Sequence, residues 1–353
     1  METRDFSMST TQKKRKKKKR HSLLYKFLLC IEIFVILAFV VIGLTIKCIS
    51  VVNTTPLDES QVITVNEDIH MGDYTNIALF GVDTRSTDLS SEKSRSDAII
   101  IVSINNRTKE VKMTSVYRDS YVSVNGTYTK INHAYAYGGP ELAISTLNRN
   151  YDLNISQYAT VNFKIMANIV DALGGIELEV ESDFIDDLNK YIKSVNHYNG
   201  GNSPGFTQAG TYTFDGNQAV AYARIRHNQN GDISRANRQR IVLKAIMDKA
   251  KFHPVSFLKA VNEVLPQVQT NLSTNDLMKM VLNAPRYKLS KQEGFPYDHT
   301  EVRLSDGLFY DVPTTLKENV IKLHENLFGT INYEVSEELN RINNKICWQT
   351  GYY

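Results

Sequence analysis

An uninterrupted apolar run, FLLCIEIFVILAFVVIGLTI, occupies Phe27–Ile46 near the start of this 353-residue chain. Its 20 residues carry a single charge, Glu32. At a rise of about 1.5 Å per residue, a helix of this length crosses the roughly 30 Å hydrocarbon core of a bilayer. The run is apolar all round, unlike a surface helix, and no small-residue cleavage site follows it. We therefore predict an uncleaved transmembrane anchor over residues 23–47 rather than a cleaved signal peptide.

Basic residues precede this anchor and predict its orientation. The run KKRKKKKR, Lys13–Arg20, lies in a predicted cytoplasmic tail, residues 1–22, because Lys and Arg beside an apolar span stay on the cytoplasmic side. The protein is then a single-pass type II membrane protein whose later residues lie outside the cytoplasm. From Cys48 onward the chain has 30 basic and 35 acidic residues, a net charge of −5. Such a mildly acidic body argues against nucleic-acid binding, the rival interpretation of the basic run.

The remainder of the chain divides into a stalk, one domain and a tail. Residues 48–71 are polar and without periodicity, so we expect an extracellular stalk there. Strands are predicted at 76–82, 97–104, 110–117, 157–163 and 176–180, and helices at 138–151, 164–173, 215–224, 232–251, 254–285 and 312–329. This alternation predicts one α/β domain over residues 72–330, with a mixed β-sheet core flanked by helices. Residues 331–353 remain as a C-terminal tail.

Charged residues stand at the ends of the first three predicted strands. Asp83 follows the first strand, Asp97 precedes the second, and Arg118-Asp119 follows the third. If these strands are antiparallel neighbours, the three ends meet at one edge of the sheet. Two carboxylates with no His or Cys nearby suit Mg²⁺, with Mn²⁺ as the alternative ion. A single Asp-Arg pair is more often a surface ion pair or a turn cap. The arginines close by in the sequence are Arg85 and Arg95.

A second charged stretch, ARIRHNQNGDISRANRQR, contains five arginines and no lysine. With Asp232 as the N-cap of the long helix, Arg235, Arg238 and Gln239 would share one helix face at spacings of three and four residues. Planar guanidinium groups match phosphate oxygens two at a time, which lysine does not. The pattern is therefore typical of a site for a phosphate-bearing ligand with an apolar tail. An exposed arginine-rich helix with an ordinary buried stripe fits this helix equally well.

Seven motifs carry a family resemblance. They are GVDTR, SRSDAIIIVSIN, VYRDS, KINHAYAYGG, NFKIMANIVDALGGIELEV, YARIRH and GDISRANRQR. In this order they resemble the LytR-CpsA-Psr family of bacterial cell-wall transferases, densely over residues 72–252 and more loosely to about residue 330. The resemblance implies an enzyme that moves an anionic glycopolymer, with its phosphate, from undecaprenyl pyrophosphate to the C6 hydroxyl of N-acetylmuramic acid in peptidoglycan. The polymer would be teichoic acid, capsule or another wall glycan, handled at a Gram-positive-like cell surface.

The resemblance also implies roles for individual residues. Pyrophosphate binding falls on Arg95, Arg118, Arg224 and Arg226 with Gln239 beside them, and Arg85 joins this set by its position. Mg²⁺ binding falls on Asp83 and Asp97. The catalytic candidates are Arg118, Asp119, Asp232, Arg235 and Arg238. The polyprenyl chain would lie in an apolar pocket of the sheet-and-helix core. One departure is visible, since Tyr117 stands where the family usually has the proline before the Arg-Asp pair.

Some alternatives stay open at this point. Asp119 and Asp232 are candidate bases for the sugar hydroxyl, but either could instead be the partner of a neighbouring arginine, and we favour that structural role for Asp119. A lipid-pyrophosphate hydrolase would use the same site with water as the acceptor. A non-catalytic, membrane-anchored regulator of envelope assembly is the third interpretation, although both predicted metal aspartates are present.

Overall fold

The computed structural model describes residues 55–58, 62, 71–84, 89, 94–226 and 231–353 of the chain. The predicted anchor, residues 23–47, and the candidate Arg85 lie outside the described residues. Among the helices that are described, none combines the length and the apolar character needed to cross a membrane.

A six-stranded mixed sheet forms the centre of the fold, in the order β10-β3-β2-β1-β6-β9. Its strands are β1 (Tyr74–Val82), β2 (Ser96–Asn105), β3 (Glu110–Val116), β6 (Gln157–Asn162), β9 (Gln269–Thr270) and β10 (Lys288–Phe295). The first three form an antiparallel meander, while β6 runs parallel to β1 and β10 runs parallel to β3. The apolar run DAIIIVSI is the central part of β2, which explains its β-branched composition.

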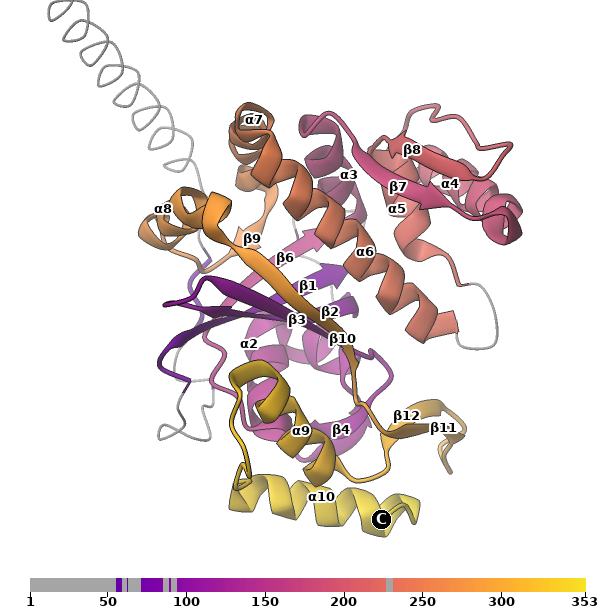
Figure 1. The fold of residues 1–353 in the computed structure, drawn as a ribbon. Coiled ribbons are helices and arrows are strands. Elements are labelled where there is room, and N and C mark those ends of the chain that lie inside the picture. The colour runs from indigo at the N-terminus through magenta and orange to yellow at the C-terminus, as the bar shows by residue number, and fades with distance from the viewer. Residues whose placement is uncertain (1–54, 59–61, 63–70, 85–88, 90–93, 227–230) are drawn as a thin grey trace, which may run out of the picture. The chain divides into compact units, whose positions relative to one another are not determined.

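Helices cover both faces of this sheet (Figure 1). One side carries α2 (Asn132–Tyr151), α9 (Leu316–Phe328) and α10 (Glu337–Thr350), and the other carries α3 (Phe163–Ala172), α6 (Gly231–Phe252) and α7 (Pro254–Val264). The helix α8 (Thr274–Asn283) follows β9. Together these layers confirm the predicted α/β fold with a mixed sheet flanked by helices.

A smaller unit packs beside α3 and α6 around a second apolar core. It contains the hairpin β7 (Ile176–Val180) and β8 (Gly210–Phe214) with α4 (Ile185–Asn199) and α5 (Gly216–Arg224). Asp215 caps α5 by accepting a hydrogen bond from the backbone N–H of Gln218, close to the start of the helix predicted there. Two further hairpins, β4 (Tyr121–Val124) with β5 (Thr127–Lys130) and β11 (His299–Arg303) with β12 (Phe309–Pro313), adjoin the main sheet.

The two faces of the sheet are buried to different extents. Side chains alternate between the faces along a strand, and paired residues share a face. On the α2 side, which we call the packed face, β1 presents Asn76, Ala78, Phe80 and Val82, all of them buried. The opposite side, which we call the open face, includes Leu79, Val102, Ala159 and Val161, and these four remain partly exposed. On the same face Ile77, Ile100 and Met113 are buried, so the apolar surface on the α6 side is covered in part.

Several predicted boundaries differ from the structure. Residues 254–285 were expected to be one helical segment, but β9 interrupts it because Gln269 and Thr270 pair with β6. The late helix begins at Leu316 rather than Val312, since β12 takes up Val312 and Pro313. The helix predicted at 138–151 starts at Asn132, with a kink at Gly138 and Gly139. These differences follow from long-range strand pairing and helix packing, which a local pattern does not contain.

Two predicted features need separate comment. The long helix α6 already includes Gly231, so Asp232 lies in its first turn rather than preceding it as an N-cap. The side chain of Asp232 lies outside what the structure describes. Residues 331–353, which the sequence sets apart as a tail, include α10, and its buried Leu339, Ile342 and Ile346 join the main apolar core.

Candidate functional site

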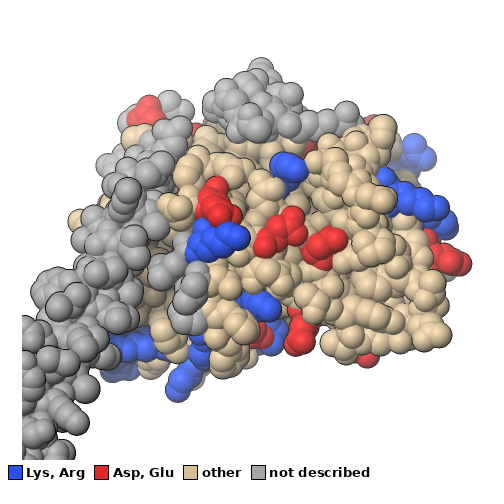
Figure 2. Space-filling model, turned by 90° about the horizontal axis from the view of Figure 1, so that it is seen from above, with Lys and Arg blue, Asp and Glu red and all other residues tan. Residues whose placement is uncertain are grey.

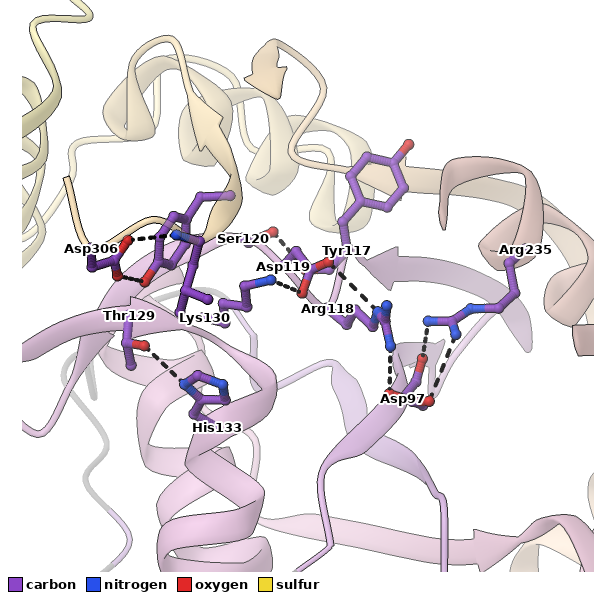
Figure 3. Close-up of polar contacts among 12 residues, drawn as sticks. Asp97, Tyr117, Arg118, Asp119, Ser120, Thr129, Lys130, His133, Arg235 and Asp306 are labelled. Carbon is purple, nitrogen blue, oxygen red and sulfur yellow. Dashed lines mark hydrogen bonds and ion pairs between the residues drawn. The ribbon is translucent and has the colours of Figure 1, made fainter. Parts of the chain in front are cut away.

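Asp97 is the centre of a charged cluster at one end of the sheet (Figure 3). Arg118 Nη1 lies 2.9 Å from Asp97 Oδ1, and Arg235 Nη1 lies 3.7 Å from Asp97 Oδ2. Arg235 Nη2 also donates a hydrogen bond to the Asp97 carbonyl oxygen at 3.2 Å. The antiparallel β2–β3 pairing brings the start of one strand beside the end of the other, and α6 supplies Arg235 from above. Residues 138 positions apart in sequence thus meet around one carboxylate.

Asp119 lies on the other side of Arg118 and is itself held between two cations. Its Oδ1 is 2.9 Å from Lys130 Nζ, and its Oδ2 is 3.7 Å from Arg118 Nε. All three side chains are less than one-fifth exposed, at 16–19 %. Each of its two carboxylate oxygens thus faces a cation. This geometry favours the interpretation of Asp119 as a partner of Arg118 rather than as the base.

The arginines of α6 point in different directions. Arg235 and Gln239 line a small cavity of about 10 Å³ together with Asp97, Tyr117 and Arg118. Arg238 instead lies over the Phe184 ring, 5.0 Å from its centroid, and its Nη1 donates a hydrogen bond to Ser234 Oγ. The expectation that Arg235, Arg238 and Gln239 act from one face therefore holds in this structure for Arg235 and Gln239. Arg238 is turned toward the smaller unit because α6 packs against both cores.

A second group of site residues surrounds a cavity of about 350 Å³. Asp83, which follows β1, and Arg224, at the end of α5, both line it. The Arg224 guanidinium stacks on Phe163 with 4.7 Å between its Cζ and the ring centroid. Asp83 comes immediately after the β1–β2 pair Val82–Ser96, so it lies at the same end of the sheet as Asp97. The predicted convergence of these strand ends is present, with Asp83 and Asp97 lining separate cavities.

The remaining predicted arginines lie nearer to solvent. Arg95 and Arg226 are both exposed. Arg95 is close enough to His133 to influence it: burial lowers the pKa of His133, and the charges of Arg95 and Lys130 lower it further. His133 Nδ1 is hydrogen-bonded to Thr129 Oγ1 at 2.9 Å. His133 is therefore a hydrogen-bonded imidazole beside the cluster whose neutral form is favoured.

Tyr117, the departure from the family's usual proline, has a clear structural role. Its backbone N–H donates to the Phe295 carbonyl oxygen at 2.8 Å, a bond that proline cannot make. This bond continues the β3–β10 pairing by one residue toward Arg118. The Tyr117 side chain occupies the space over Gly294, where any larger residue would collide with it. The substitution thus extends the strand pairing while the Arg-Asp pair stays in place.

Two cations of the site were not among the predicted residues. Lys130, at the end of β5, forms the ion pair with Asp119 described above. It is the first residue of the motif KINHAYAYGG, so its position in that motif could have marked it as a site residue. Arg240 on α6 is only 7 % exposed and lies near Tyr117 and Glu293. Burial lowers the pKa of Arg240, and those two neighbours oppose the effect. Arg240 is one of the five arginines of the stretch ARIRHNQNGDISRANRQR, but the sequence did not show that it is buried, because its burial depends on the contact between α6 and β10.

Metal binding has two candidate ligands here. Within the described part of the chain, no group of three or more His, Cys, Asp or Glu side chains is placed to hold a metal ion. Mg²⁺ is nevertheless commonly bound through one or two carboxylates together with water and substrate phosphates. Asp83 and Asp97 at one end of the sheet fit such a phosphate-dependent ion, although the Asp97 carboxylate accepts from Arg118 in this structure.

On the face shown in Figure 2, the described residues form no broad basic region. Seen from above, the described part of the surface shows acidic and basic side chains interspersed among uncharged ones (Figure 2). The arginines that meet at Asp97 are less than one-fifth exposed, so this cluster is set into the protein rather than spread over it. A local site for a compact anion agrees with this distribution better than a surface for an extended polyanion.

Comparison with known proteins identifies the family. The profile of the LytR_cpsA_psr family matches residues 43–323. The polyisoprenyl-teichoic acid–peptidoglycan teichoic acid transferase TagU of Bacillus cereus (strain AH820) is 30% identical over 264 residues, covering 72% of this chain and 80% of TagU. The corresponding transferase TagT of Bacillus subtilis (strain 168) is 34% identical over 209 residues, covering 59% of this chain and 62% of TagT.

Solved structures agree with the sequence comparison. TagT bound to LI-WTA superposes with a TM-score of 0.60 at 26% identity, covering 78% of this chain and 100% of that chain. The LytR-CPS2A-psr family protein YwtF (TagT) with bound octaprenyl pyrophosphate lipid gives a TM-score of 0.57 at 27% identity with the same coverage. The prediction that this chain is an enzyme of the transferase class is confirmed by these relatives. The chain belongs to the LytR-CpsA-Psr family.

Proposed function

We propose that this protein transfers an anionic glycopolymer, with its phosphate, from undecaprenyl pyrophosphate to the C6 hydroxyl of N-acetylmuramic acid in peptidoglycan, in a Mg²⁺-dependent reaction. The reaction takes place outside the cytoplasm, with residues 23–47 as the membrane anchor. The names of TagU and TagT, both teichoic acid transferases, support the reaction class and make teichoic acid the first polymer to test.

The observation that carries this proposal is the convergence of Arg118 and Arg235 on Asp97. They come from a strand end and from a helix on the opposite layer, yet both guanidinium groups reach one carboxylate. Phosphoryl transfer depends mainly on charge neutralisation and alignment, with little covalent chemistry for the protein to perform. Two planar forks held in this way would bind the oxygens of a diphosphate, with Gln239 in the same cavity as a further hydrogen-bonding group.

The open face of the sheet provides a place for the lipid. Leu79, Val102, Ala159 and Val161 retain solvent exposure although they lie in the middle of the sheet. Covering these side chains with a polyprenyl chain would remove apolar surface from water, at about 25 cal/mol per Å². The TagT structure with bound octaprenyl pyrophosphate supports a lipid of this type for a protein of the same fold.

Asp83 and Asp97 would hold the magnesium ion. When bound, the ion neutralises charge that develops on the phosphate oxygens. The arginines would bind and orient the diphosphate beside these carboxylates. The acceptor hydroxyl oxygen then bonds to the glycan-bearing phosphorus, the bond from that phosphorus to the bridging oxygen breaks, polyprenyl phosphate leaves, and the hydroxyl proton is released. Asp119 stabilises Arg118 throughout, since its carboxylate is engaged with Arg118 and Lys130.

The proposal is tested with the full-length chain in detergent, a labelled lipid-pyrophosphate glycan and peptidoglycan. Label should appear on peptidoglycan with Mg²⁺ and disappear when the ion is chelated. Asp97→Asn should reduce transfer by at least about 100-fold, because it removes the negative charge that orients both arginines. Asp187→Asn is the matched control, since it removes an exposed ion pair with Lys190 elsewhere. Unchanged transfer by Asp97→Asn, or release of the label into water alone, would contradict the proposal.

A further inference from the structure

The 350 Å³ cavity beside Asp83 is built from four separate parts of the chain. Asp83 and Thr84 follow β1, Phe163 and Lys164 begin α3, and α5 contributes Val220 and Arg224. The end of α4 supplies Val195, Tyr198 and Asn199. The helices α3, α4 and α5 lie side by side at this end of the molecule (Figure 1). Its volume falls in the range of about 300–1,000 Å³ that is common for small-molecule sites.

The lining combines aromatic rings with hydrogen-bonding groups. Phe163 is partly buried with Arg224 stacked on it, whereas Tyr198 is 51% exposed. Around the rings stand a carboxylate, an ammonium group, a guanidinium group and a side-chain amide, contributed by Asp83, Lys164, Arg224 and Asn199. A lipid chain would need only the apolar groups, and an inorganic anion would need only the cations. A pyranose ring, with an apolar C–H face and a rim of hydroxyl groups, uses both kinds of group.

The cavity wall is held in place by a network of asparagines. Asn199 Nδ2 donates to Asn217 Oδ1 at 3.1 Å, and Asn217 Nδ2 donates to Asn196 Oδ1 at 3.0 Å. Lys164 Nζ donates to the Asn199 carbonyl oxygen at 2.8 Å. These bonds connect the end of α4 to both α5 and α3, so the Tyr198 backbone is fixed before any ligand arrives. A site with its backbone already ordered loses less entropy on binding.

We propose that this cavity binds a hexopyranose ring adjoining the diphosphate, with Tyr198 as a contact for the apolar face of the sugar. The proposal rests on the proposed function, because Asp83, assigned there to the metal, lines this cavity together with Arg224, for which the family resemblance implies pyrophosphate binding. Two sugars have the required chemistry: the first sugar of the lipid-linked donor and the muramic acid of the acceptor. The experiment below separates these two sources.

The test uses full-length protein in detergent and the variants Tyr198→Ala and Tyr198→Phe. Tyr353→Ala is the control, since Tyr353 is an exposed tyrosine of the chain terminus that lines none of the site cavities described above. Binding is measured for polyprenyl diphosphate without sugar and for the same lipid carrying the glycan, and transfer is measured over a range of soluble peptidoglycan concentrations. Circular dichroism and thermal unfolding check that each variant is folded.

If the cavity binds the donor sugar, Tyr198→Ala weakens binding of the glycan-bearing lipid by about tenfold and leaves the sugar-free lipid unaffected. If it binds the acceptor sugar, both lipids bind normally and the half-saturating concentration of peptidoglycan rises by about tenfold. Tyr198→Phe should keep most of either interaction because it retains the ring. Wild-type behaviour of Tyr198→Ala in every arm would overturn the sugar site while leaving the proposed function intact. Absence of transfer by the wild-type protein would contradict the proposed function, and the sugar site with it.

Discussion

The two faces of the central sheet share the same strands but differ in how completely they are covered, since the open face includes partly exposed as well as buried apolar side chains. On the packed face, Phe80 packs against Tyr135 of α2 with 5.2 Å between ring centroids, and both rings are buried. On the open face, the neighbouring residue Leu79 remains partly exposed under the α6 layer. A shift of one position along β1 thus separates a residue that stabilises the fold from one available to a ligand.

This difference suggests separate roles for the two faces, one in stabilising the fold and the other in binding a ligand. The packed face contains buried side chains from α2, α9 and α10, including Ile144, Val320 and Ile342, and it has little surface left for a ligand. The open face lies beside the Asp97 cluster, which faces α6 through Arg235. Substitutions on the packed face should therefore act mainly on stability, and those on the open face mainly on binding and transfer.

The largest expected effect comes from the charged cluster at the edge of the open face. Arg118→Ala should lower transfer by about 100-fold to 1,000-fold, because it removes a group that stabilises charge on the diphosphate. Arg149→Ala is the matched control: Arg149 forms a 2.6 Å ion pair with Glu338 between α2 and α10, on the other side of the sheet. Initial transfer rates of the two variants check this contrast. Similar losses of transfer rate in both variants would show that activity does not depend more on the open face than on the packed face.

The next effect concerns stability and appears on the packed face. Phe80→Ala should lower the free energy of unfolding by about 3–5 kcal/mol, because it leaves a cavity under α2. Leu79→Ala should cost clearly less, since its side chain is already partly in contact with water. Urea unfolding of the two variants in detergent measures the difference. Equal destabilisation by the two substitutions would mean that the open face is as well packed as the other.

The sequence predicted the strands of this sheet and the charged end, but not the difference between its two faces. The buried strand β2, the antiparallel meander and the meeting of Asp83, Asp97 and Arg118 at one end of the sheet all follow from strand patterns and short turns. Such features depend on neighbouring segments, and local periodicity describes them well. The full set of candidate arginines and aspartates came from the family resemblance instead, and it remains a prediction.

Other features depend on contacts between distant segments and could not be read from local patterns. The strand β10 contains the polar sequence KLSKQEGF, and it is recognised as a strand only through its pairing with β3. Arg238 was expected beside Arg235, but α6 packs against two cores at once and turns Arg238 toward Phe184. The packing of α10 on the main core likewise required the positions of α2 and α9.

A moderate effect should follow from blocking the open face. Val102→Trp places a large ring among the partly exposed side chains and should weaken binding of polyprenyl diphosphate by about tenfold, by taking the space of the lipid. Thr211→Trp, at an exposed position of β8, introduces the same ring outside the sheet and should bind the lipid normally. Fluorescent lipid titrations distinguish the two variants. Undiminished lipid affinity in Val102→Trp would place the lipid elsewhere.

The smallest effect is a pH dependence on the packed side of the molecule. His324 is fully buried, and its ring stacks on Tyr333. Its Nε2 is hydrogen-bonded to the Tyr151 carbonyl oxygen at 2.9 Å. Its Nδ1 has no hydrogen-bond partner among the described residues. Burial lowers the pKa of His324 below its usual 6.5, so the folded state favours the neutral ring. The stability that depends on this neutral ring is fully present above pH 6.5 and is lost as the pH falls below it.

Thermal unfolding between about pH 8 and about pH 5 should show this loss in the wild type and a smaller loss in His324→Gln, whose amide can still donate to Tyr151 but does not titrate. Identical pH profiles would mean that other groups cause the dependence and that the packed face tolerates a charge at this position.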